Sequence, residues 1–216
     1  MPEGDLLVSK ALPLNTRKCF VSSDCKWIIY GLRNNLVCML NTENGEVVHE
    51  INDHGGWIEG VEFSPQSNKF VTIGKDGIAR MFDSLTGKLL HSNNFRALFG
   101  GKCKFSNKGD IYILHCQIGM DASTPIAYDA LTGKELFKIK HGSGVNDLSF
   151  TVDDQKILTT SRDSTAKMWN RHDVTLPLHS YSNGDWVSSA LVKESYPDRV
   201  FTFSRKGDFW LKAFKH

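Results

Sequence analysis

Three polar residues in the middle of the chain have the side chains of a hydrolytic triad. Thr159, His141 and Asp163 supply a hydroxyl, an imidazole and a carboxylate. In a hydrolase, the carboxylate orients the imidazole, and the imidazole takes a proton from the attacking hydroxyl. The same groups can instead form a buried hydrogen-bond network, in which each polar atom is satisfied by its neighbour. Trp169 follows closely and adds an indole N–H donor.

The elements that carry these residues are predicted to be antiparallel strands. Apolar residues alternate over residues 145–150 and again after a polar turn at residues 153–156. A third alternating run follows Asp163 and ends at Asn170. Runs of this length with period two, separated by turn residues, are typical of strands joined by hairpins.

Residues 141–170 resemble a WD40 repeat. His141 opens the unit, Asp163 stands in a tight turn, and a small, basic, aliphatic and Trp sequence ends at Trp169. The next residue is Asn170, where the family usually has Asp. The resemblance implies an all-β fold, the WD40-type β-propeller, built of about five four-stranded blades.

The aromatic strand end recurs along the chain. Copies at residues 40–41, 82–83, 128–129, 169–170 and 214–215 are separated by 42, 46, 41 and 45 residues, the first copy being the weakest. A WD40 blade of four strands needs about 40–45 residues. Glycines follow the strand ends in step, and they suit the positive φ of a hairpin turn. These glycines are Gly45, Gly87 and Gly133.

The repeats predict how the chain is organised. After an N-terminal segment, residues 1–18, we expect WD40 repeats over residues 19–216, at about 19–53, 54–95, 96–140, 141–182 and 183–216. The last repeat has three predicted strands, and residues 6–14 have strand character, so they could pair with its open edge and close the ring. The family usually has seven blades, so a closed five-bladed ring and part of a larger ring, completed by further sequence or a partner, both stay open. The 119–125 loop is either a partner contact or sequence drift.

The resemblance gives the triad-like residues a structural role. In the family, these positions form a buried tetrad in which Trp169 donates to Thr159, Thr159 to His141 and His141 to Asp163. A hydroxyl occupied in this way is not a nucleophile, so we expect no catalytic residues and no enzyme activity. Two other repeats keep parts of the tetrad, namely His54, Thr72 and Asp76 with Phe82, and Asn183, Ser204 and Asp208 with Phe214.

A second resemblance favours an enzyme. Residues 127–137 resemble the docking motif of quinoprotein propellers, which bind pyrroloquinoline quinone, although that motif usually ends in Trp and this chain has Phe137. The only near copy lies at residues 82–88, and the shared Asp-x-x-Thr-Gly-Lys also suits a plain hairpin turn. The sequence has no glycine-rich phosphate loop, HExxH or GxSxG motif. We predict no cofactor.

Composition excludes several classes of function. The net charge of +2 is too small for a nucleic-acid footprint or for binding an anionic membrane. Five cysteines form no CxxC pair, so neither a disulfide framework nor a metal site is expected. No apolar run approaches about 18 residues, and the amino terminus lacks a signal-peptide pattern. We expect a cytoplasmic or nuclear protein with reduced thiols and no small-molecule substrate.

Recognition of other proteins is the function that the loops favour. When the repeats are aligned, Trp57 and Trp186 share the position that enters the first strand, and cations gather before the turn Asn or Asp. Trp and Arg are frequent hot spots, and a basic collar suits an acidic or phosphorylated peptide. The alternative is that the indoles pack between blades and the cations are solvated. The predicted partner-binding residues, on the narrow propeller face, are Trp57, Trp186, Arg33, Lys75, Arg162, Arg205 and Lys206.

These observations predict a non-catalytic WD40 scaffold that mediates protein–protein interaction within a multiprotein complex. A second hypothesis is an RNA-binding propeller subunit of a ribonucleoprotein, because a basic face with aromatic side chains can bind single strands. The near-neutral charge disfavours nucleic acid. A quinoprotein-like propeller enzyme is the third hypothesis.

Overall fold

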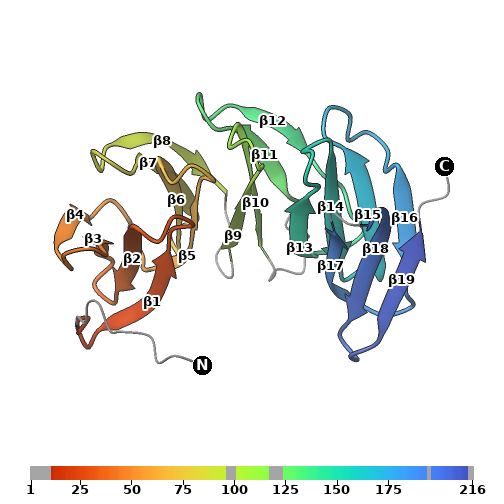
Figure 1. Cartoon of the computed structure of the whole chain (residues 1–216), viewed down its shortest axis with the longest axis horizontal. Helices are drawn as coiled ribbons and strands as arrows, with labels where there is room; N and C mark the ends of the chain where they lie inside the picture. Colours follow the sequence, from red (N-terminus) through yellow and green to blue (C-terminus); the bar gives the residue numbers. More distant parts are fainter. Residues whose placement is uncertain (1–10, 96–100, 117–123, 194–195, 214–216) are drawn as a thin grey trace, which may run out of the picture. The chain divides into compact units, whose positions relative to one another are not determined.

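The computed structural model describes residues 11–95, 101–116, 124–193 and 196–213, and all regular secondary structure in these ranges is β. The chain forms two compact units, Met1–Leu98 and Phe99–His216. The strands form five antiparallel sheets, here called blades 1 to 5 (Figure 1). The predicted all-β fold with about five blades is therefore confirmed.

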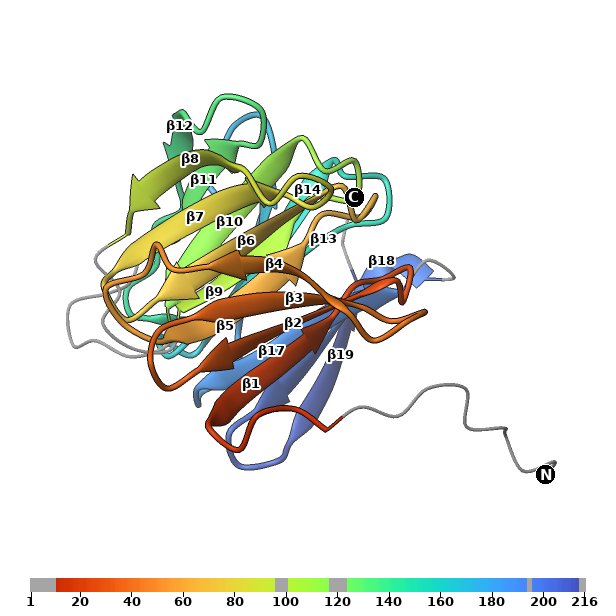
Figure 2. The ribbon, with the colours of Figure 1, turned by 90° about the vertical axis from the view of Figure 1, so that its left-hand side faces the viewer.

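The first unit contains blades 1 and 2, each of four strands in sequential order. Figure 2 shows the strands of blade 1 side by side. Blade 1 consists of β1 (Thr16–Val21), β2 (Trp27–Leu32), β3 (Val37–Asn41) and β4 (Val47–Ile51). Blade 2 consists of β5 (Ile58–Phe63), β6 (Lys69–Gly74), β7 (Ile78–Asp83) and β8 (Leu89–Asn94).

The second unit contains blades 3 to 5. Blade 3 consists of β9 (Gly101–Phe105), β10 (Ile111–Cys116), β11 (Ile126–Asp129) and β12 (Glu135–Lys138). Blade 4 consists of β13 (Val145–Phe150), β14 (Lys156–Ser161), β15 (Thr165–Asn170) and β16 (His179–Ser182). The described part of blade 5 has three strands, β17 (Val187–Lys193), β18 (Tyr196–Ser204) and β19 (Phe209–Ala213).

Burial explains the sequence pattern of the strands. The second strand of a blade is buried on both faces, as in β10, where all six residues are buried. The fourth strand is mostly exposed, as in β8 and β12. Neighbouring blades within a unit pack face to face, so a central strand needs apolar residues at consecutive positions. In the first unit, Met39, Phe70 and Phe82 lie in the shared core, and each fully buried side chain of this kind contributes about 1.5–3 kcal/mol.

The hairpin turns form as predicted. Gly45, Gly87 and Gly133 have φ values of 71°, 67° and 70°, which only glycine adopts without strain. In the last two turns, the preceding aspartate closes the loop. Asp83 Oδ1 accepts hydrogen bonds from the Thr86 backbone N–H at 2.8 Å and from its hydroxyl at 2.8 Å, and Asp129 does the same with Thr132.

Some predictions lie partly or wholly outside the described residues. Of the possible ring-closing strand at 6–14, only residues 11–14 are described, and they are coil and turn rather than strand. Residues 119–123 of the long loop and Phe214 also lie outside. The boundaries of the five repeats stay predictions.

Candidate functional site

Blade 4 contains the predicted tetrad, which is confirmed in full. Trp169 Nε1 donates to Thr159 Oγ1 at 2.8 Å, and Thr159 Oγ1 lies 2.7 Å from His141 Nε2. His141 Nδ1 lies 2.9 Å from Asp163 Oδ2. An indole only donates and an ionised carboxylate only accepts, so a neutral His141 must carry its proton on Nδ1 and accept from Thr159 at Nε2. The Thr159 hydroxyl is fully buried and engaged on both sides, as a structural role requires.

The carboxylate at the end of this network is held in its ionised form. Burial raises the pKa of Asp163, but hydrogen bonds from His141 and Thr165 outweigh burial and hold the pKa well below its usual range. The backbone N–H of Gly142 also donates to Asp163, at 2.9 Å. A carboxylate with these partners is stable inside the blade.

Blade 2 has a related network with a different last member. His54 Nε2 lies 2.7 Å from Thr72 Oγ1, but His54 Nδ1 and Asp76 Oδ1 are 3.5 Å apart. Arg80 Nη1 fills this gap, 2.8 Å from His54 Nδ1 and 2.7 Å from Asp76 Oδ2. Arginine has no acceptor, so His54 Nδ1 must accept and the His54 proton must be on Nε2. The hydrogen-bond direction is the reverse of that in blade 4, because Phe82 cannot donate to Thr72.

The prediction for blade 5 was wrong in its register, at Ser204 and at Asp208. Asn183 Nδ2 donates to Thr202 Oγ1 at 2.9 Å, and Ser204 is not its partner. Thr202 pairs with Ala190 across the sheet as Thr159 pairs with Leu148 in blade 4. Ser204 Oγ instead accepts the backbone N–H groups of the following turn.

Strand register also corrects the alignment of that turn. The left-handed residue is Gly207 in blade 5, Ser164 in blade 4 and Gly77 in blade 2, with φ of 92°, 68° and 76°. Lys206, which precedes Gly207, therefore takes the place of Asp163. Val200 pairs with Lys212 where Ile157 pairs with Trp169. Blade 5 thus has lysine where the other blades have the buried side chains Leu40, Phe82, Tyr128 and Trp169.

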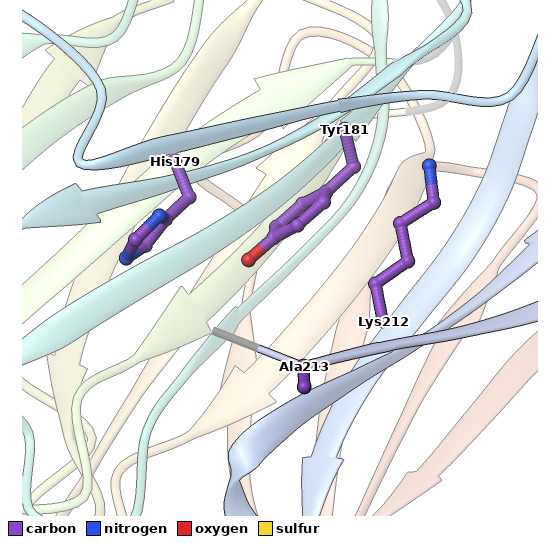
Figure 3. A pocket seen from close by; sticks show the side chains of 4 residues that line it. All are labelled: His179, Tyr181, Lys212 and Ala213. Carbon is purple, nitrogen blue, oxygen red and sulfur yellow. The ribbon is translucent and has the colours of Figure 1, made fainter. Parts of the chain in front are cut away.

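Lys212 lines a pocket of about 500 Å³ together with His179, Tyr181 and Ala213 (Figure 3). His179 and Tyr181 project from β16 with their rings stacked, 6.1 Å between centroids. Lys212 Nζ lies 5.6 Å from the Tyr181 ring centroid and donates to Ser182 O at 2.9 Å.

The two predicted hot-spot tryptophans occupy the same backbone position. Trp57 O accepts from the Lys75 backbone N–H and Trp186 O from that of Arg205, both at 3.0 Å. In the equivalent bonds of blades 1 and 4, the acceptors are Asn15 O and Gly144 O, and the donors are Arg33 and Arg162. The turn cation and the entering residue are thus adjacent in each of these four blades.

Trp57 is the centre of the first cation–aromatic cluster, here called the Trp57 cluster. Arg17 Cζ lies 3.8 Å and Lys75 Nζ 4.2 Å from its ring centroid. The half-buried indole donates its N–H to Glu59 Oε1 at 2.9 Å. Lys18 Nζ pairs with Glu59 Oε2 at 3.6 Å. The cluster therefore contains its own carboxylate.

The second cluster, here called the Trp186 cluster, is more exposed. Trp186 keeps 38% of its surface accessible, and Arg205 Cζ and Arg162 Cζ lie 4.9 and 5.1 Å from its ring centroid. Arg162 comes from the preceding blade, and its Nε donates to Asn146 Oδ1 at 3.3 Å. Asn146 Nδ2 in turn donates to Val187 O at 2.8 Å. This bridge orients the guanidinium toward blade 5.

The predicted site residues thus fall into two groups. Trp57 lies with Lys75, and Trp186 lies with Arg162 and Arg205. Arg33 and Lys206 are exposed turn residues of blades 1 and 5. The two clusters belong to different units, so their place on one common face stays a prediction.

Sequence reasoning missed three residues of these clusters. Arg17, Glu59 and Asn146 each stand two residues after the position of the entering Trp, where the first strand has an irregular register. A repeat alignment extended by two positions would have placed them. The described residues contain no group of three or more His, Cys, Asp or Glu arranged to hold a metal ion. They also include no helix that is long and apolar enough to cross a membrane.

Comparison with known proteins agrees with this architecture. The sequence model described as "WD domain, G-beta repeat" matches residues 45–83 and 133–170. The guanine nucleotide-binding protein subunit beta-like protein of Encephalitozoon cuniculi (strain GB-M1) is 27% identical over 147 residues, which are 65% of this chain and 42% of that protein.

Solved structures show the same fold. The computationally designed Ika8 protein has a TM-score of 0.73 at 19% identity, covering 92% of this chain and 58% of its own. The C-terminal WD40 domain of Sif2 has a TM-score of 0.73 at 16% identity, covering 94% of this chain and 57% of its own. Fold, tetrad and turns together define a WD40-type β-propeller architecture.

The chain resembles the WD40-repeat family in two sequence segments and in its fold. Members of this family are typically non-catalytic proteins that bind other proteins. The chain matches about two fifths of the length of its curated relative.

Proposed function

We propose that this chain is a non-catalytic scaffold that binds an acidic or phosphorylated segment of a partner protein within a multiprotein complex. The binding residues are the Trp57 and Trp186 clusters. The observation that carries the proposal is the pairing of an accessible indole with two cations at the same backbone position in two blades.

The chemistry of the clusters supports an anionic partner. An indole with an exposed edge supplies apolar contact area, and flanking cations supply charge-assisted hydrogen bonds. In the Trp57 cluster, the Glu59 carboxylate accepts from the indole and pairs with Lys18, so the cluster already accommodates one carboxylate of its own chain. A carboxylate of a partner offers the same chemistry.

A charge-reversal experiment tests the proposal. The double variant Lys75→Glu/Arg162→Glu places an acid in each cluster and should abolish binding to a panel of immobilised acidic and phosphorylated peptides. The matched control is Lys88→Glu/Lys134→Glu, which changes the net charge equally at two exposed hairpin turns, one in each unit. Equal loss in both variants, or in neither, would count against the clusters as the site.

The tetrad supports the non-catalytic part of the proposal. The Thr159 hydroxyl accepts from an indole and is fully buried, so no substrate carbonyl reaches it. The quinone-docking resemblance also has a structural account, because Asp129 and Thr132 close a hairpin turn as Asp83 and Thr86 do. A melting temperature unchanged by added pyrroloquinoline quinone is the expected result.

Single-stranded RNA is the second candidate ligand, and the exposed Trp186 ring beside two guanidinium groups favours it. Bases stack on such rings, and cations contact the phosphates. A filter-binding assay with a salt titration separates the candidates, since RNA binding weakens steeply with salt.

A further inference from the structure

The two tryptophan clusters differ in whether they contain an anion. At the Trp57 cluster, Glu59 accepts from the indole and pairs with Lys18. At the Trp186 cluster, the equivalent position is Ser188, whose hydroxyl donates to Phe203 O at 3.0 Å. Among the described residues, the second cluster therefore has two cations beside its indole, as the first does, but a serine at the position of Glu59.

The turn beside Trp186 in blade 5 also differs in charge from the equivalent turn in blade 4. In blade 4, the turn cation Arg162 is followed by Asp163, and in blade 5 Arg205 is followed by Lys206. Neither Arg162 nor Arg205 forms a salt bridge with a carboxylate that the structure describes. Asp185 is the adjacent acid, and its Oδ1 accepts the Trp186 backbone N–H at 2.8 Å. Two cations thus lie beside the indole, a third follows Arg205 in the turn, and the adjacent acid is bound to backbone.

The two guanidinium groups of this cluster lie beside one indole ring. Both lie on the same ring, at 4.9 and 5.1 Å from its centroid, so their Cζ atoms are at most 10.0 Å apart. The Arg162 bond to Asn146 uses Nε and leaves its Nη groups to form the fork that binds an oxyanion. A phosphate monoester has three acceptor oxygens and about −1.5 to −2 charges, which can engage two forks, whereas a carboxylate suits one.

From this geometry we propose that the Trp186 cluster is a phosphate-selective site that binds a phosphorylated side chain of a partner protein between Arg162 and Arg205. This inference rests on the proposed function and narrows it. The Trp57 cluster, with its internal carboxylate, does not select phosphate.

Three peptides with one acidic sequence test the proposal, with Ser, phosphoserine or Glu at the central position. Isothermal titration with the whole chain should give about tenfold tighter binding of the phosphopeptide than of the Glu peptide, a gain typical of one additional charge-assisted bidentate contact. The variant Arg162→Lys/Arg205→Lys keeps both charges and removes both forks, so it should lose the preference and retain the Glu peptide. Arg17→Lys, in the Trp57 cluster, is the matched control and should keep the preference.

A further variant acts in the opposite direction. Asp185→Asn keeps the oxygen that accepts the Trp186 backbone N–H and removes the negative charge. It should therefore tighten phosphopeptide binding by a few-fold. Unchanged melting temperatures of all variants establish that the fold is intact.

The outcomes separate the two proposals. If the phosphoserine and Glu peptides bind equally, or if Arg17→Lys loses the preference as fully as the double variant, phosphate selectivity is wrong and the scaffold proposal stands. If no acidic peptide binds, both are wrong. If inorganic phosphate or a uridine oligonucleotide binds as tightly as the phosphopeptide with the same arginine dependence, the site is not one for a phosphorylated protein.

Discussion

The hydrogen-bond networks of blades 2 and 4 use the same His and Thr positions but opposite proton directions. In blade 4, Trp169 donates to Thr159, and the chain of donors runs toward Asp163. In blade 2, Arg80 donates to both His54 and Asp76, and the histidine proton points to Thr72. The comparison shows that a tetrad can lose its indole and remain satisfied when a donor enters from the other end.

Whether a second donor can replace the indole depends on one position in the third strand of the blade. Arg80 pairs with Thr72 across the sheet, and Lys167 pairs with Thr159 in the same register. Lys167 Nζ is 3.9 Å from Asp163 Oδ2, whereas the longer, forked Arg80 reaches both the imidazole and the carboxylate. A lysine suffices in blade 4 because the indole already completes the network.

The largest expected effect is the removal of a network carboxylate. Asp163→Ala leaves the His141 Nδ1–H and the Gly142 N–H without their acceptor inside the blade, which should lower the free energy of unfolding by about 3 kcal/mol. Urea denaturation followed by circular dichroism measures this change. Asp173→Ala, at an exposed turn, is the control and should leave the free energy of unfolding nearly unchanged.

The second prediction separates the two networks by their basic residue. Arg80→Ala should destabilise the chain by about 2 kcal/mol, because Asp76 and His54 both lose their shared partner. Lys167→Ala should cost less than about 0.5 kcal/mol, as expected for a distant and partly exposed ion pair. Equal costs in a denaturation experiment would contradict the different roles inferred for these residues.

A third experiment converts the blade 4 network into the blade 2 type. Trp169→Phe removes the indole donor and should cost about 1–2 kcal/mol through the lost hydrogen bond and smaller volume. Adding Lys167→Arg should recover part of this loss and move the His141 proton from Nδ1 to Nε2. Nitrogen-15 NMR of the imidazole distinguishes the two tautomers, and wild-type His54 should already show the Nε2–H form.

The smallest effect is a difference in pH dependence. Burial and the nearby Arg80 lower the pKa of His54 below 6.5. The unfolded chain therefore takes up this proton first, so the stability contributed by neutral His54 is lost progressively as the pH falls below about 6.5. Asp163 acts at lower pH, because its depressed pKa stabilises the fold above about 3.8 and the contribution is lost below that value.

Hydrogen exchange measured residue by residue checks this order. Between about pH 6 and pH 5, backbone amides of β6 should lose protection before those of β14. The variant His54→Gln has no titrating ring and should remove the difference. Simultaneous loss of protection in both strands of the wild-type chain would contradict the assignment to His54.

Much of the fold was predictable because turn residues and strand-end aromatics recur at regular intervals along the chain. The spacing of strand-end aromatics and the turn glycines defined the blades, and His141, Thr159, Asp163 and Trp169 stood at fixed intervals that one strand register satisfies. The error at Ser204 has a simple cause. Residues two apart on a strand face the same side, so Ser204 and Thr202 are equivalent in sequence pattern, and only cross-strand pairing distinguishes them.

The candidate site was predictable only in part. Trp57 and Trp186 were identified from their shared position, but their surroundings depend on side chains from neighbouring strands and blades. Arg17 and Arg162 reach the indoles from the preceding blade, and Glu59 reaches Trp57 from the irregular start of β5. No local sequence window contains either arginine together with the tryptophan that it contacts.

The sequence by itself determined the repeat, the strands, the turns and the members of the blade 4 tetrad, because each depends on residue type and short-range spacing. Only the tertiary structure decided the direction of each histidine proton, the role of Arg80 and the position of Arg162 beside the Trp186 ring. These depend on which donor lies within hydrogen-bond distance of which acceptor across the sheet. These distances are set by tertiary packing, which brings together residues that are far apart in the chain.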